Sequence, residues 1–279
     1  MSDIGFPALA LADWTSTRDA LHAYARILGK MRQSLTPPQA HGWHASILIG
    51  PAGLTTGELI IDEETEDTLE IVLDLVNHRM TATTSRGQRW AMPLSGQPAR
   101  LLADSLLLTL MQWDVYPEVD RGLISDESTG RYNQAAAQRY FQTISTIHTL
   151  WQQFKQEISG RTGPVRIWPH HFDLSMLWFS GNLVPGIDPA DEDQAEEQIA
   201  FGFSTGDEGI PDAYFYITAY PWPEEMSEAS LPSPARWHTE SWKGALLMYA
   251  DVAAAPDPAA LLNAFLRAAH SAGETLMLE

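Results

Sequence analysis

The 279-residue chain contains no cysteine. This absence excludes disulfides, thiolate nucleophiles and cysteine-ligated zinc or iron–sulfur sites. Basic residues are scarce too, with 17 Lys and Arg against 36 Asp and Glu, so the formal net charge is −19. A charge of this sign repels nucleic-acid phosphates and anionic membrane surfaces. We therefore expect neither nucleic acid nor a membrane as a partner.

Long apolar runs are also missing. The richest segment, 101–113, is amphipathic and contains Asp104 and Gln112, whereas a membrane-spanning helix needs about 20 consecutive apolar residues. The opening residues, MSDIGFPALALADW, lack the basic cluster of a secretory signal. We therefore expect a soluble, cytoplasmic protein.

The acidic residues are concentrated in three runs, at 62–67, 188–197 and 224–228. None of these runs has acidic ligands at alternate positions around a central glycine, which is the pattern of a calcium loop. We expect all three to be solvated loops.

The hydrophobic periodicity predicts an α+β fold with antiparallel sheets and with helices packed on one face. Apolar residues recur at helical spacing at about 16–35, 98–113 and 132–158, and in a last helix that begins at Pro258. Alternating residues predict the strands, at about 43–49, 69–77, 80–84, 88–92, 165–168, 172–179, 198–204, 213–220 and 246–251.

Finer details of the helices can be predicted as well. Thr15 or Ser16 is expected to cap the first helix, and Asp257 the last one. The buried stripe of the second helix is expected to comprise Leu101, Leu102, Leu106, Met111 and Trp113.

The order helix, strands, helix occurs twice, in residues 1–120 and again in residues 121–279. The residue identities of the two halves barely match, so the similarity is one of order. Two interpretations stay open: two tandem halves, or one continuous globular unit.

The densest polar and aromatic cluster is His41-Gly42-Trp43-His44. Two imidazoles at this spacing can share a divalent metal ion, with a third ligand from elsewhere completing the site. Asp173 can supply that ligand if its strand adjoins the strand of the histidines. The alternative is a pair of structural histidines that are hydrogen-bonded where the strand begins.

Thr55 and Thr56 lie in the segment Gly53–Gly57, which we expect to be a turn. Hydroxyls and backbone amides on a turn can hold an anion, although the lysine and the spacing of a P-loop are absent. The alternative is a tight turn in which the threonines bond their own backbone.

Tyr214, Tyr216 and Tyr220 share one face of a predicted strand, and Trp222 follows them. These rings can line a ligand pocket or a partner groove, or they can pack in the core.

Several motifs occur in a characteristic order. They are Leu21-His22, Gly29-Lys30, Pro38-Gln39-Ala40-His41-Gly42-Trp43-His44, Gly53-Leu54-Thr55-Thr56, Gly163-Pro164-Val165, Phe172-Asp173-Leu174, Phe179-Ser180-Gly181, and Phe215-Tyr216 through Ala219-Tyr220-Pro221. This order resembles an uncharacterised bacterial family, the domain of unknown function 5996, over roughly residues 6–269. The resemblance implies a location for the site and no activity.

The chain departs from the family pattern at several of these positions. Arg166 stands where a His is usual, Asn182 where an Arg is usual, and Ala40 where an Asn is usual. Pro169-His170-His171 replaces a Trp-Gly-Ser type of run. These departures put in doubt any inherited site that needs that His and that Arg.

Three functions remain as hypotheses, and whether the chain is an enzyme stays open. The first is a small-molecule-binding protein or enzyme whose pocket comprises His41, Trp43, His44, Thr55, Thr56 and Asp173. The second is a metal-dependent hydrolase that uses His41, His44 and Asp173 as ligands of a divalent metal cofactor. The third is a protein-interaction module with an aromatic edge and no catalysis.

Overall fold

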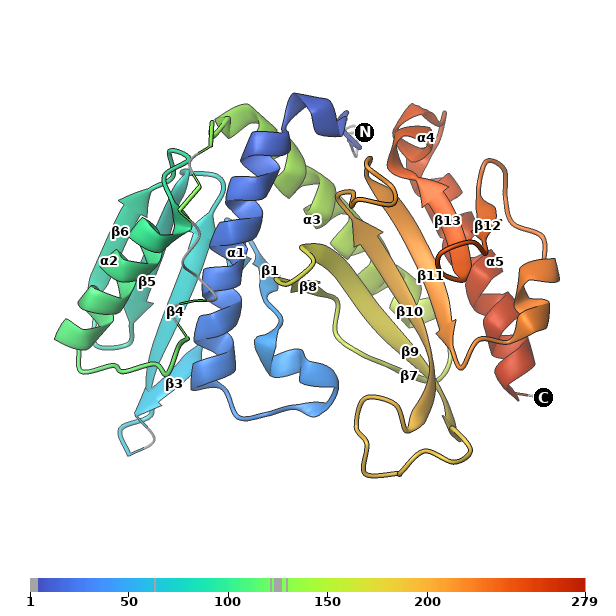
Figure 1. Ribbon diagram of the computed structural model, residues 1–279, viewed down its shortest axis with the longest axis horizontal. Helices are drawn as coiled ribbons and strands as arrows, with labels where there is room; N and C mark the ends of the chain where they lie inside the picture. The colour runs from blue at the N-terminus through green and yellow to red at the C-terminus, as the bar shows by residue number, and fades with distance from the viewer. Residues whose placement is uncertain (1–4, 63, 121, 123–126, 129, 279) are drawn as a thin grey trace. The chain divides into compact units, whose positions relative to one another are not determined.

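The computed structural model describes residues 5–62, 64–120, 122, 127–128 and 130–278. It confirms the α+β class, with two antiparallel sheets and several helices (Figure 1). The contacts within the chain divide it into two compact units. Unit 1 comprises Met1–Leu11, Gln142–Val165 and Asp173–Glu279, and unit 2 comprises Ala12–Phe141 and Arg166–Phe172.

In unit 2, the strands pair in the order β1 (Leu48–Gly50), β2 (Gly53–Thr55), β4 (Asp67–Asp74), β5 (Arg79–Thr84) and β6 (Arg89–Pro93), and β3 (Leu59–Asp62) also pairs with β4. Helix α1 (Thr15–Leu35) packs on β3 and β4, and it also contacts α2 (Ala99–Gln112). The core between α1 and the sheet includes Leu21, Leu28, Ile71 and Leu73, all of them fully buried.

Strand β8 (Arg166–Trp168) returns to unit 2 from later in the chain. The backbone of Ile167 is bridged to that of Ile47, and both of these side chains are fully buried. This bridge fixes β8 beside the segment that follows η2 (Ala40–Ala45), a 3₁₀ helix.

In unit 1, the strands pair in the order β12 (Arg236–His238), β13 (Gly244–Met248), β11 (Tyr214–Tyr220), β10 (Glu196–Ser204), β9 (Asp173–Leu183) and β7 (Arg161–Thr162). Helix α5 (Pro258–Leu278) packs on β9, β10 and β11. Helix α3 (Gln134–Glu157) runs from unit 2 into unit 1, where its Phe154 contacts Phe201. The remaining short helices are η1 (Leu11–Asp13), η4 (Glu224–Glu228) and α4 (Tyr249–Ala254).

The predicted strand at 43–49 is wrong over its first half. The segment instead forms η2, which is kinked at His41 and Gly42 by non-helical, positive φ angles of 53° and 64°, and β1 begins only at Leu48. A residue spacing of two over such a short stretch fits a turn as well as a strand. Similarly, residues 249–251 belong to α4 and not to a strand.

The predicted stripe of the second helix is partly wrong. Leu101 and Met111 are 50% and 48% exposed, whereas Leu102, Leu106 and Leu110 are fully buried. The buried face therefore follows the four-residue spacing from Leu102, and its neighbour Leu101 points outward.

The predicted N-terminal cap is confirmed for one of the two helices for which a cap was predicted. The predicted cap of α1 is wrong, because Trp14 stands at this position and makes no side-chain cap bond. Ser16 Oγ instead accepts the Arg131 N–H at 2.7 Å. The predicted cap of α5 is confirmed, because Asp257 accepts the Ala260 N–H at 2.9 Å.

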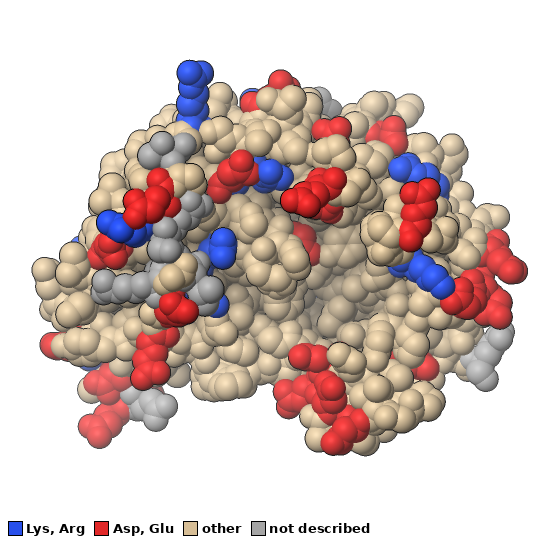
Figure 2. All heavy atoms as spheres, in the orientation of Figure 1, with Lys and Arg blue, Asp and Glu red and all other residues tan. Residues whose placement is uncertain are grey.

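The described acidic side chains of the three runs are exposed or half-buried, and Glu63 lies outside the described residues. The prediction of loops is wrong for 224–228, which forms η4 around the buried Met226, and for the end of 188–197, where β10 begins at Glu196. Figure 2 shows acidic side chains gathered over the loop that joins β9 and β10. In the first run, Asp67 Oδ2 pairs with Arg86 Nε at 2.6 Å. In the described part of the chain, no helix is long and apolar enough to span a membrane.

Candidate functional site

Five of the six predicted pocket residues belong to unit 2. His41, Trp43 and His44 lie in η2, while Thr55 ends β2 and Thr56 directly follows it. Both segments contact α1: η2 through the Ala45 carbonyl, which lies beside Gly29, and the end of the second segment through the Thr56 carbonyl, which accepts a hydrogen bond from Arg32. The sixth residue, Asp173, opens β9 in unit 1.

The threonine hydroxyls are already engaged by the protein. Thr55 Oγ1 donates to Glu70 Oε1 at 2.6 Å and accepts the Gly57 N–H. Thr56 Oγ1 donates to the Gly57 carbonyl at 2.7 Å and accepts the Ile71 N–H at 3.0 Å. The turn predicted at Gly53–Gly57 is wrong over its first three residues, because Gly53–Thr55 form β2. Both hydroxyls bond the backbone of Gly57, as the alternative expects, and they also bond Glu70 and Ile71.

In η2, the side chains of the histidines are oriented by their neighbours. The Gln39 N–H donates to His44 Nδ1 at 3.2 Å, so a neutral His44 carries its proton on Nε2. The His41 and Trp43 rings lie 5.1 Å apart between centroids. All three side chains are half-buried. Their aromatic rings are therefore partly accessible to solvent and are not sealed in the core.

Asp173 is held by a tyrosine of its own unit. Tyr216 donates to Asp173 Oδ2 at 2.5 Å, and its ring lies across Gly202, where an added Cβ would stand 1.8 Å from it. Burial and the charge of Asp173 raise the pKa of Tyr216 well above its ordinary value, so the phenol is neutral at physiological pH.

Over the described ranges, no group of three or more His, Asp or Glu side chains is placed to hold a metal ion. The metal set of His41, His44 and Asp173 therefore stays a prediction without support from the geometry.

Arg32, which the sequence analysis did not select, is a buried cation with incomplete bonding. It is 8% exposed, and its Nη1 donates to the Thr56 carbonyl. Its Nε is buried and has no hydrogen-bond partner within the described part of the chain. Burial lowers the pKa of Arg32, and the charge of Arg166 lowers it further. A buried charge of this kind is costly unless it is paired.

Arg166, at the start of β8, is the second cation. It is half-buried, and burial lowers its pKa. Among the described residues, neither Arg166 nor Arg32 forms an ion pair. By contrast, the surface cation Arg86 pairs with both Asp62 and Asp67. We call Arg32 and Arg166 the arginine pair.

A rigid turn follows the arginine pair along β8. Phe172 has a φ of 61°, which is strained by about 1–3 kcal/mol for a bulky side chain. Its ring is stacked on His22 at 5.4 Å and lies 5.0 Å from Tyr140. His22 Nε2 lies 2.9 Å from the Pro169 carbonyl. Such strain persists only where the surroundings enforce it, and it is often found at binding sites.

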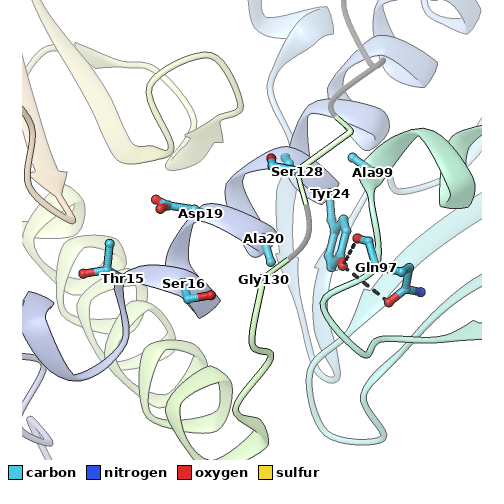
Figure 3. A pocket seen from close by; sticks show the side chains of 10 residues that line it. Thr15, Ser16, Asp19, Ala20, Tyr24, Gln97, Ala99, Ser128 and Gly130 are labelled. Carbon is cyan, nitrogen blue, oxygen red and sulfur yellow. Dashed lines mark hydrogen bonds between the residues drawn. The ribbon is translucent and has the colours of Figure 1, made fainter.

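Each unit also contains a cavity away from these groups. In unit 2, a cavity of ≈330 Å³ lies beside the first turns of α1 (Figure 3). Its Tyr24 hydroxyl donates to the Gln97 carbonyl at 2.7 Å. In unit 1, a cavity of ≈390 Å³ is lined by Phe6, Tyr249 and several alanines. No buried polar atom lacking a partner is found among the described residues lining either cavity.

The sequence does contain a signal for the arginine pair. Arg32 follows Leu28 by four residues and therefore lies on the apolar face of the first helix. A lone charge at such a position predicts a buried cation. Its pairing with Arg166 could not be foreseen, because the two residues are more than 130 positions apart in the chain.

One family model, described as "Family of unknown function (DUF5996)", matches residues 6–277. No curated protein and no solved structure matches the chain.

Proposed function

Since the chain belongs to the DUF5996 family, whose description assigns no function, we propose its function from the site itself: it binds a small anionic molecule at the arginine pair. The ligand carries a carboxylate or a phosphate, which are the groups that guanidinium donors recognise with two parallel hydrogen bonds.

A single observation carries the proposal: among the described residues, the buried Arg32 Nε has no hydrogen-bond partner, and the nearby Arg166 guanidinium forms no ion pair. Two like charges that are withdrawn from water repel each other and lose hydration. A bound anion would relieve both penalties and would satisfy the free Nε.

This proposal keeps the first hypothesis, a small-molecule-binding protein, and changes the residues that hold the ligand. Thr56 contributes by fixing Arg32 through its carbonyl rather than by offering its hydroxyl. His41, Trp43 and His44 contribute as the neighbouring wall on the α1-facing segment η2.

The test is a titration of the whole chain with inorganic phosphate and with acetate at constant ionic strength, followed by thermal unfolding. A ligand that binds only the folded state stabilises it by RT ln(1 + [L]/Kd), about 2.7 kcal/mol at one hundred times Kd. We expect this stabilisation in the wild type and its loss in Arg166→Met.

The matched control is Arg86→Met, which removes the same charge from a surface arginine that already has carboxylate partners. It should keep the anion effect. Equal stabilisation of the wild type and Arg166→Met by both anions would refute the proposal.

A further inference from the structure

The residues beside the arginine pair narrow the class of ligand, and this step rests on the proposed function. We infer that the anion carries a flat aromatic ring, which stacks on Trp168 while its charged group reaches Arg166.

The geometry of β8 places the Arg166 and Trp168 side chains on the same face of the strand. Arg166 and Trp168 are two residues apart on the strand, so their side chains leave the same face, about 6.5–7 Å apart at the backbone. Ile167 between them points the other way into the core, where it is fully buried. The alternating burial of the three residues confirms this orientation.

The Trp168 ring lies beside η2, within ordinary van der Waals distance of a Cβ built at Gly42. Gly42 in η2 has a φ of 64°, and a Cβ built there would lie 3.8 Å from Trp168 Cζ3. The His41 and Trp43 rings of the same segment are 5.1 Å apart, and the His170 ring meets Trp168 edge-on at 5.8 Å.

These rings are not core residues. Trp43 and Trp168 are half-buried and His170 is exposed, whereas the core aromatics Tyr24 and Phe172 are at most 1% exposed. Large rings that are left partly open beside a cation suit stacking and edge contacts with a planar ligand. A guanidinium also stacks on aromatic faces, so Arg166 can favour the ring as well as the charge.

The platform is held in place before any ligand arrives. The turn after Trp168 is fixed by the stacking of Phe172 on His22, and Pro169 packs on Gly29, where an added Cβ would lie 2.6 Å from Pro169 Cγ. A binding surface that needs no rearrangement loses less affinity to ordering.

The experiment measures the affinities of three probe anions for the whole chain by isothermal titration calorimetry. Benzoate and cyclohexanecarboxylate have the same charge and nearly the same size, but only benzoate is flat and aromatic, and acetate has no ring. We expect benzoate to bind roughly three- to tenfold more tightly than cyclohexanecarboxylate, the range typical of an aromatic contact.

Variants assign this preference to its residue. Trp168→Leu should bring the benzoate to cyclohexanecarboxylate ratio close to one and leave the affinity for acetate unchanged. Trp168→Phe keeps an aromatic ring and should keep most of the preference for benzoate. It also provides a variant at this position if Trp168→Leu does not fold. Arg166→Met should weaken all three probes, and Trp222→Leu, a half-buried tryptophan of unit 1, should change none.

The outcomes separate the two proposals. Equal affinities for benzoate and cyclohexanecarboxylate in the wild type, or an unchanged ratio in Trp168→Leu, would overturn the aromatic class while anion binding stands. Failure of all three probes, acetate included, to bind in an Arg166-dependent manner would overturn the proposed function itself.

Discussion

Removing one arginine of the pair should make the unliganded protein more stable, not less. In Arg166→Met, a side chain of similar length replaces the charge, so the packing beside β8 is largely kept. The variant loses the repulsion with Arg32 and the desolvation of a second guanidinium. Replacing even a buried ion pair by well-packed apolar residues is often neutral or stabilising by about 1–4 kcal/mol. Since Arg166 is only half-buried, we expect the low end, about 1 kcal/mol.

The assay is urea unfolding followed by far-ultraviolet circular dichroism, together with a thermal scan, in a buffer free of phosphate and carboxylate. A gain of about 1 kcal/mol corresponds to a rise in Tm of about 2–4 °C for a domain of 150–250 residues. Arg86→Met is the matched control, because it makes the same change in net charge. It breaks an exposed pair with Asp67 and should lose no more than about 1 kcal/mol.

The sign of the change decides whether the reasoning holds. If Arg166 had a partner in the folded protein, its removal would leave that partner buried and unpaired, at a cost of about 3–5 kcal/mol. A loss of that size in Arg166→Met would refute the view that the arginine pair is an anion-binding site.

Three further predictions concern the framework. Burial lowers the pKa of His270 although Glu274 Oε2 lies 3.6 Å from its Nδ1, so the unfolded chain binds the proton more readily than the folded one. The free energy of unfolding should therefore fall as the pH drops below about 6.5, the ordinary pKa of histidine. His270→Phe should reduce this fall, as measured by urea titrations at pH 7 and pH 5. Gly202→Ala places a Cβ 1.8 Å from the Tyr216 ring and should lower stability by about 1–3 kcal/mol or more in the same assay; an unchanged urea midpoint would contradict the packing. Asp257→Ala removes the cap of α5 and should lower stability by about 0.5–2 kcal/mol, whereas Asp257→Asn should retain most of it.

The elements predicted most reliably were those whose signal in the sequence is local and clear. The helix at 16–35 agrees with α1 within one residue, because Leu21, Tyr24 and Leu28 mark one face over several turns. The hairpin of β5 and β6 was also correct, because Gly87 marks its turn. In each case the signal is local to the chain.

The candidate site was predicted only in part, because its geometry depends on an unusual backbone angle and on a contact between distant parts of the chain. Its first segment was expected to be a strand, but it forms the 3₁₀ helix η2, kinked at His41 by a positive φ that few sequence rules identify. The arginine pair depends on β8, which arrives from a distant part of the chain and is fixed by the bridge between Ile47 and Ile167. The division of the chain at residue 120 stays a prediction.

The overall charge and the local charge act on different steps of binding. The chain carries −19 overall, yet the arginine pair is cationic, so an approaching anion is repelled before it is attracted. Glu58 is exposed and only two residues beyond Thr56, whose carbonyl fixes Arg32. A unit charge about 10 Å away contributes about 0.4 kcal/mol in water, which is roughly a twofold change in rate.

Glu58→Gln should therefore speed the association of benzoate by up to about twofold and leave its dissociation rate unchanged, as measured by the line shapes of the ligand in nuclear magnetic resonance spectra. Glu58→Asp keeps the charge and should behave like the wild type. In 1 M salt the difference should vanish, because the Debye length is then about 3 Å. A change confined to the dissociation rate would mean that Glu58 contacts the ligand, and the separation of long-range repulsion from local attraction would then be wrong.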